Sequence, residues 1–203
     1  MEEKKRMLQG KIYDPNTKEL VELRKKAHKL CKEFNSVEED NEEKRNEILK
    51  KLNLKIARNA YLTGPIYFDY GCFISIGENS YANFNFTILD TCPVTIGNNV
   101  FIGTNVSLVT PLHPLRYQDR NTYISNEGYL TDKEYAKPIT IEDNCWIASN
   151  VTICGGVTIG SGSVIGAGSV VTKSIPKDSL AFGNPCKVIR KITEEDKIKQ
   201  DLL

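Results

Sequence analysis

Basic residues are missing from most of the chain. The 203 residues include 27 lysines and arginines, but none lies in 65–108 or 139–172, and the net charge is only +1. A nucleic-acid interface needs cations clustered on one surface to meet the phosphates. A membrane-spanning helix needs about 20 consecutive apolar residues, and the sequence shows neither such a run nor a signal peptide. We therefore expect neither a nucleic-acid nor a membrane partner.

Histidines and paired cysteines are equally scarce. The only two histidines are His28 and His113. A zinc site built from three histidines, as in carbonic anhydrases, is therefore excluded, and we expect no metal. None of the six cysteines forms a C-x-x-C pair. Unpaired cysteines of this kind are typical of proteins in a reduced compartment, so we expect a cytoplasmic protein.

The dominant pattern is a six-residue repeat of aliphatic residues. Isoleucine or valine stands at every sixth position from Ile141 to Val171, and the same spacing occurs upstream from Ile96 to Leu108. Neither the 3.6-residue period of a helix nor the two-residue period of a strand produces this spacing. A short fixed repeat indicates stacked units, and a hexapeptide repeat is typical of a β-helix.

The third residue after most of these aliphatic positions is also restricted. It is asparagine or glycine, the two residue types that best tolerate a positive φ. Each hexapeptide therefore reads as a short strand followed by a sharp corner, and three of them make one triangular coil. These corner positions are Asn79, Asn85, Asn99, Asn105, Asn144, Asn150, Gly156, Gly162 and Gly168.

Four further segments carry a more specific signal. They are YFDYGCFISIGENSYANFNFTILD (67–90), HP (113–114), EYAKPITI (134–141) and VIGAGSVVTKSIPKDSLAFGNPCKVIRKI (164–192). Together with the hexapeptides, they resemble the maltose/galactoside O-acetyltransferase family of hexapeptide-repeat acyltransferases. The resemblance covers nearly the whole chain. It implies a mainly β fold, a left-handed parallel β-helix with an N-terminal α-helical cap and a long excursion loop.

The same reading divides the chain into three parts. Residues 1–58 contain 16 of the 27 basic residues and have a helical pattern, with one helix expected from near Thr17. A capping box, Ser36 with Glu39, predicts the start of a second helix. Residues 59–175 form the β-helix, interrupted by a loop at 109–138, and residues 176–203 form a C-terminal cap and tail. Long ordered loops on a rigid scaffold are usually functional.

His113 stands at the mouth of this loop. A neutral imidazole accepts a proton near neutral pH, which suits a general base. The HP pair matches the family's catalytic position, so the resemblance implies that His113 activates the acceptor hydroxyl. Its second ring nitrogen needs a hydrogen-bond acceptor, and either Glu134 or a backbone carbonyl of the loop could supply one.

Polar residues interrupt the apolar pattern of the first coils at Asp69, Asn83 and Asp90. Asp and Asn satisfy sharp corners by hydrogen bonding to the backbone. Their side chains also bind several sugar hydroxyls at once. The resemblance implies this second role, acceptor binding, for all three residues.

Coenzyme A is the donor that the resemblance implies, as acetyl-CoA. Its phosphates need cations, which the region after Val171 supplies and the coils do not. In the family, backbone groups of two residues contact the pantetheine arm, and the remaining residues serve the nucleotide end. The matching positions are Ser149 and Ala167 for the arm, and Thr172, Lys173, Lys187 and Arg190 for the nucleotide.

These features predict an acetyl-CoA-dependent O-acetyltransferase that acts on a hydroxyl of a sugar or glycoside. No Ser-His-Asp or Cys-His grouping favours a covalent route, so we expect direct transfer in a ternary complex. Two alternatives stay open: an acetyltransferase with a non-sugar or amino acceptor, and a non-catalytic assembly subunit. Faces without basic residues suit packing against further copies, and with the family's habit they indicate a homotrimer with active sites between subunits.

Overall fold

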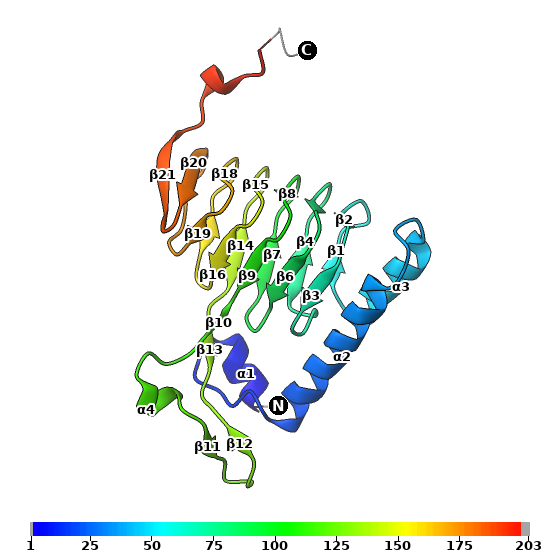
Figure 1. Cartoon of the computed structure of the whole chain (residues 1–203), viewed down its shortest axis with the longest axis vertical. Coiled ribbons are helices and arrows are strands. Elements are labelled where there is room, and N and C mark those ends of the chain that lie inside the picture. The colour runs from blue at the N-terminus through cyan, green and yellow to red at the C-terminus, as the bar shows by residue number, and fades with distance from the viewer. Residues whose placement is uncertain (1, 200–203) are drawn as a thin grey trace.

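A triangular column of short strands dominates the computed structural model, which describes residues 2–199 (Figure 1). Each strand pairs in parallel with the strand one coil earlier, over about six turns. The first face contains β1 (Lys55–Ile56), β4 (Ile74–Ile76), β7 (Val94–Ile96), β14 (Ile139–Ile141) and β17 (Thr158–Ile159). The second contains β2 (Tyr61–Leu62), β5 (Tyr81–Ala82), β8 (Phe101–Ile102), β15 (Trp146–Ile147) and β18 (Val164–Ile165). The third contains β3 (Ile66–Phe68), β6 (Phe86–Leu89), β9 (Ser107–Val109), β16 (Thr152–Cys154) and β19 (Val170–Val171).

The six-residue repeat fills the interior of this column. Strand pairing aligns Ile96, Ile141 and Ile159 on successive coils, and Ile141 and Ile159 are 0 % exposed. Burying one such side chain is worth about 1.5–3 kcal/mol, so the stacked aliphatic residues are the main source of stability. The predicted β-helix is confirmed.

Every predicted Asn or Gly corner has a positive φ, as expected. The asparagines also stack from coil to coil. The side-chain amide of Asn85 donates to Asn105 over 3.0 Å, and that of Asn105 donates to Asn150 over 3.1 Å. We call this edge, between the second and third faces, the asparagine corner; it comprises 83–85, 103–105, 148–150 and 166–168.

Three helices precede the column: α1 (Glu2–Leu8), α2 (Lys18–Asn35) and α3 (Glu42–Lys51). Helix α2 begins after Thr17, as predicted, and packs along β3. Its last residue, Asn35, bonds the backbone N–H and C=O of Ile66 through its side-chain amide. The predicted capping box is wrong. Ser36 ends α2 instead of starting a helix, and Asn41 caps α3 by accepting a hydrogen bond from a backbone N–H.

The excursion leaves the column after β9, at the edge between the third and first faces. We call this edge the excursion corner; it also includes 69–73, 90–93, 155–157 and 172–174. In Figure 1 the excursion extends below the column beside α1. Its pairings are antiparallel, β10 with β13 and β11 with β12. Its elements are β10 (Pro111–Leu112), α4 (Tyr117–Arg120), β11 (Tyr123–Ile124), β12 (Leu130–Thr131) and β13 (Tyr135–Ala136).

At its C-terminal end the second face adds β20 (Ser179–Gly183), and β21 (Cys186–Lys191) folds back on it as an antiparallel hairpin. A single 3₁₀ turn, Glu194–Asp196, follows. The end of the predicted tail, 200–203, lies outside the described residues. Within residues 2–199, no helix combines the length and apolarity that crossing a bilayer requires. All six cysteines are free thiols.

Candidate active site

His113 lies between two carboxylates at the base of the excursion. Its Nδ1 is 3.4 Å from Oδ2 of Asp132, and its Nε2 is 3.9 Å from Oε1 of Glu134. The imidazole is about half exposed, whereas both carboxylates retain only about a fifth of their surface. Because Asp132 and Glu134 are two residues apart in an extended segment, their side chains point to the same side. The two carboxylates therefore flank both ring nitrogens.

Glu134 is held by the N-terminal segment. The Tyr13 hydroxyl donates to Oε2 of Glu134 over 2.5 Å, and the two residues also pair through their backbones. Burial raises the pKa of Glu134, and the Tyr13 hydrogen bond opposes that rise. The Tyr13 side chain is itself buried, which raises the pKa of its hydroxyl and keeps it a donor. This arrangement leaves Oε1 of Glu134 facing His113.

Asp14 anchors the far end of the excursion to the same segment. Its Oδ2 accepts a hydrogen bond from the Tyr129 hydroxyl over 2.7 Å, and its Oδ1 accepts one from the Thr131 hydroxyl. The Asp14 carboxylate raises the pKa of Tyr129 to about 12. Asp14 therefore fixes the strand that leads directly to Asp132.

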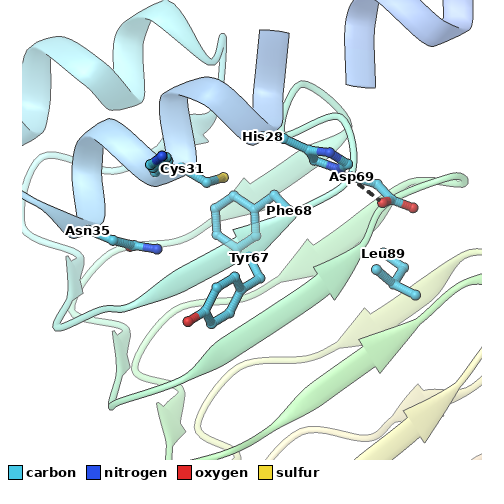
Figure 2. Close-up of a pocket in the computed structure, with 8 residues that line it drawn as sticks. His28, Cys31, Asn35, Tyr67, Phe68, Asp69 and Leu89 are labelled. Carbon is cyan, nitrogen blue, oxygen red and sulfur yellow. Dashed lines mark ion pairs between the residues drawn. The ribbon is translucent and has the colours of Figure 1, made fainter. Parts of the chain in front are cut away.

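Asp69 closes one end of a cavity of about 490 Å³ between α2 and the third face (Figure 2). Across the cavity entrance, His28 of α2 directs its ring toward Asp69, with Nε2 3.6 Å from Oδ1. The Tyr67 ring and the Leu89 side chain lie on the opposite side, on β3 and β6. Burial raises the pKa of Asp69, and the adjacent His28 lowers it. Polar groups at the rim and apolar groups inside are typical of a small-molecule site.

Arg24 connects this cavity with the His113 cluster. Its guanidinium donates to the Pro15 carbonyl over 2.7 Å and to the Tyr70 hydroxyl over 3.0 Å. It interacts electrostatically with both Asp69 and Glu134. Arg24 therefore lies within electrostatic reach of both Asp69, at the end of the cavity, and Glu134, beside His113.

The other two predicted acceptor residues lie elsewhere. Asp90 is 0 % exposed, and its carboxylate accepts hydrogen bonds from the backbone N–H groups of Tyr70 and Phe73. For Asp90 the structure thus shows the corner hydrogen bonding that was the alternative interpretation. Asn83 lies at the asparagine corner, where its Oδ1 accepts the N–H of Phe84. Within one chain, Asn83 and Asp69 lie on opposite edges of the third face.

The residues predicted to bind acetyl-CoA are also divided between the two edges of the third face. Ser149 and Ala167 follow β15 and β18 at the asparagine corner, whereas Thr172 and Lys173 follow β19 at the excursion corner. The third face separates these edges. Its strand β6 has four residues, which span about 13 Å at about 3.3 Å each.

Lys187 and Arg190 lie on the exposed hairpin strand β21. Lys187 is exposed, and Arg190 forms a two-pronged ion pair with Asp196, at 2.6 and 2.7 Å. This pair raises the pKa of Arg190 and lowers that of Asp196 to about 2. The charge of Arg190, one of the predicted phosphate-binding cations, is thus already neutralised by Asp196 of the same chain.

Known proteins share both the sequence and the fold of this chain. The family model described as "Maltose acetyltransferase hexapeptide capping motif" matches residues 6–52, and "Bacterial transferase hexapeptide (six repeats)" matches 138–173. The galactoside O-acetyltransferase of Escherichia coli (strain K12) is 43 % identical over 192 residues, which cover 95 % of this chain and 90 % of that protein. The chain belongs to the maltose/galactoside O-acetyltransferase family.

Solved structures of the family agree with the fold. A galactoside acetyltransferase in complex with coenzyme A has a TM-score of 0.85 at 41 % identity, covering 98 % of this chain and 96 % of that one. A maltose O-acetyltransferase from Clostridium difficile 630 has a TM-score of 0.82 at 43 % identity, covering 95 % and 98 %. The expected fold, a left-handed parallel β-helix with a helical cap, is therefore confirmed.

Several residues near the candidate site were not expected from the sequence. His28 falls in the predicted helical segment, one residue from the buried position Ala27 and one turn before Cys31, which also lines the cavity. Asp132 lies two residues before Glu134, so in an extended segment both side chains point to the same side. This spacing is visible in the sequence and could have indicated Asp132. Arg24 and Asp14 gave no local signal, because tertiary contacts alone bring them to the site.

Proposed function

We propose that the protein transfers acetyl from acetyl-CoA to a hydroxyl group of a sugar or glycoside. The observation that carries the proposal is His113, placed between Asp132 and Glu134 at the base of the excursion. A cavity that ends in Asp69 offers room for the acceptor. The names of the relatives support it: one is a galactoside O-acetyltransferase, and one solved relative is in complex with coenzyme A.

His113 serves as the general base. Acetyl-CoA supplies an acetyl group already activated as a thioester, so the protein needs only to remove the hydroxyl proton of the acceptor and to align the two substrates. With Nδ1 directed at Asp132, Nε2 is the nitrogen free to accept that proton. The proton then passes from the imidazolium to the departing thiolate.

The two carboxylates act through the imidazole. Asp132 selects the tautomer and orientation of the ring, as a positioning residue. Glu134, held by Tyr13, lies beside the ring when it becomes positively charged and stabilises that charge. The orienting group in this proposal is therefore Asp132, which differs from both acceptors expected from the sequence, Glu134 and a backbone carbonyl, and Glu134 takes the second role.

The acceptor occupies the cavity beside His28 and Asp69. The Asp69 carboxylate accepts hydrogen bonds from sugar hydroxyls, and the Tyr67 ring, which is 50 % exposed, offers an apolar face to a sugar ring. Asp90 does not belong to this proposed site, because its carboxylate is completely buried and accepts hydrogen bonds from the backbone N–H groups of Tyr70 and Phe73.

The complete site lies between two copies of the chain, in a homotrimer. His113 belongs to the excursion corner, while Ser149, Ala167 and Asn83 belong to the asparagine corner, about 13 Å away across the third face. Reacting atoms must approach to about 3–3.5 Å. The asparagine corner of a second copy meets this requirement when it packs against the excursion corner of the first.

Acetyl-CoA then lies in the groove between those copies. Ser149 and Ala167 of one chain contact the pantetheine arm, and the cations Lys173, Lys187 and Arg190 meet the phosphates. The coil segments 65–108 and 139–172 contain no basic residues, so the nucleotide end draws on the cations that follow Val171, among them these three.

The test is the substitution His113→Ala, assayed with acetyl-CoA and a panel of sugars, glycosides and amino acceptors. A general base contributes about 10²–10⁴-fold, so kcat should fall by that factor while acetyl-CoA binding is kept. The exposed ring can be removed without disturbing the aliphatic interior. A variant that keeps more than half of the wild-type kcat would refute the role of His113. Wild-type turnover no faster than background would instead favour the non-catalytic assembly subunit.

A further inference from the structure

The His113 cluster is not closed by hydrogen bonds. Its two contacts, 3.4 Å to Asp132 and 3.9 Å to Glu134, exceed the 2.7–3.2 Å or so of a well-formed N–H···O bond. One imidazole and two carboxylates thus surround a small gap. A neutral imidazole carries a single N–H and cannot donate to both carboxylates.

The dimensions of this gap suit a metal ion. One donor atom from each of the three residues lies within 4.8 Å of the other two. Zinc bonds to nitrogen and oxygen are about 2.0–2.2 Å, so neighbouring ligands of a tetrahedral ion are about 3.4 Å apart. The separation between Nδ1 of His113 and Oδ2 of Asp132 already has this value. A small movement of the half-exposed His113 ring would bring Glu134 into range.

The surroundings favour a cation as well. Two carboxylates converge on one imidazole. Arg24 interacts electrostatically with Glu134, but the hydrogen bonds of its guanidinium go to Pro15 and Tyr70 and not to the Glu134 carboxylate. Oε2 of Glu134 accepts the Tyr13 hydrogen bond, which fixes the carboxylate and leaves Oε1 available. Hydrogen-bonded carboxylates of this kind are characteristic of metal ligands, because an outer partner orients the ligand.

We propose that His113, Asp132 and Glu134 form an inhibitory binding site for a divalent transition-metal ion, with Zn²⁺ as the best match. An imidazole with two carboxylates suits Zn²⁺, Ni²⁺ or Cu²⁺, whereas Mg²⁺ and Ca²⁺ prefer oxygen ligands alone. An ion bound at Nδ1 forces the single proton of the neutral imidazole onto Nε2, so Nε2 has no lone pair left to accept the proton of the acceptor hydroxyl. The protein needs no metal for its activity, and this ion switches the activity off.

Metal binding is measured without any acceptor or acetyl-CoA. Calorimetric titration of the metal-free full-length protein with ZnCl₂ should show one such site per chain. His113→Ala and Asp132→Asn should each weaken binding at least about 10-fold, and Tyr13→Phe, which removes only the outer hydrogen bond, about 10-fold. His28→Asn alters the other histidine–carboxylate pair and serves as the matched control, with unchanged affinity.

Cobalt separates this site from the cysteine thiols. Co²⁺ bound by nitrogen and oxygen shows only weak visible bands, whereas thiolate-bound Co²⁺ adds an intense near-ultraviolet band. We expect the visible bands to vanish in His113→Ala. Zn²⁺ affinity that is unchanged in His113→Ala, or a cobalt signal carried wholly by thiolate, would refute the site.

Inhibition is tested separately, since it rests on the proposed function of His113. Saturating Zn²⁺ should lower the formation of acetylated acceptor at least about 10-fold, EDTA should restore it, and equal Mg²⁺ should have no effect. If Zn²⁺ binds at His113 but the metal-free protein acetylates no acceptor, the metal site stands and the proposed function fails. Full activity with Zn²⁺ bound at His113 would refute the inhibition.

Discussion

A mixture of two inactive variants should regain activity if each active site is shared between copies. His113→Ala removes the base at the excursion corner. Ala167→Trp places a large ring at the exposed asparagine corner and blocks the donor groove without touching the interior. In an unmixed trimer of either variant every site carries one damaged half. In mixed trimers, some sites combine the intact His113 of one chain with the intact Ala167 corner of its neighbour.

The size of the effect follows from the arrangement of the corners. With equal amounts of the two variants and random assembly, the chance that one site receives both intact halves is one half times one half. About one quarter of the sites, and hence about one quarter of wild-type kcat, should return. The variants are denatured together, refolded and assayed for acetyl transfer, and Glu78→Trp, an exposed residue on the remaining edge, replaces Ala167→Trp as the matched control.

No recovery above the unmixed variants would place both halves of the site in one chain. The 13 Å separation across the third face would then have to be bridged by the excursion itself. A stable monomer in light scattering at micromolar concentration would refute the shared site more directly.

Three further outcomes are expected. Gly168→Asn should extend the asparagine stack and raise Tm by about 1–3 °C in thermal melts, because φ is +72° there and an added Cβ meets open space; Gly162→Asn should lower Tm, because its Cβ would lie 2.6 Å from a carboxylate oxygen. Burial raises the pKa of Asp90 to about 6 from 3.8, so its contribution to stability is complete below about pH 4 and lost as the pH rises through 6. Between about pH 4.5 and 7, the free energy of unfolding of the wild type should therefore fall by about 2 kcal/mol more than that of Asp90→Asn, as measured by urea titration. An equal fall in both proteins would contradict the raised pKa of Asp90. Lys187→Ala combined with Arg190→Ala should raise the KM for acetyl-CoA severalfold with kcat largely kept, and steady-state kinetics with an unchanged KM would move the nucleotide away from β21.

Most of the fold could be predicted because its signals are local and repeated. The spacing from Ile141 to Val171 places one buried side chain on each short strand, and each Asn or Gly three residues later takes the positive φ that the corner requires. The failure at Ser36 has the opposite origin. A capping box is a four-residue pattern, and here the last turn of α2 satisfies its own carbonyls with the Ser36 N–H before any new helix begins.

The site was less predictable because its partners are distant in sequence. His113 and Asp69 could be proposed as site residues from residue type and resemblance. His28 pairs with Asp69 across 41 residues, and Arg24 reaches Tyr70 across 46, so neither contact leaves a pattern in a short window. Asp90 shows a second limit: the same carboxylate suits a sugar or a tight corner, and its complete burial, which favours the corner, cannot be read from the sequence.

The pairing of Tyr13 with Glu134 has a consequence for the order in which the molecule forms. Stacked coils can build one on another as the chain is synthesised, because each contacts mainly its neighbours. The hydrogen bond that steadies Glu134 instead joins residues 121 positions apart. The N-terminal segment can pack on the first coils through the Met7, Tyr13, Leu20 and Tyr70 cluster, but the Tyr13 hydroxyl gains its partner only when the excursion has been made. A chain that ends before Glu134 would therefore have the coils up to β9 but no Glu134 beside His113.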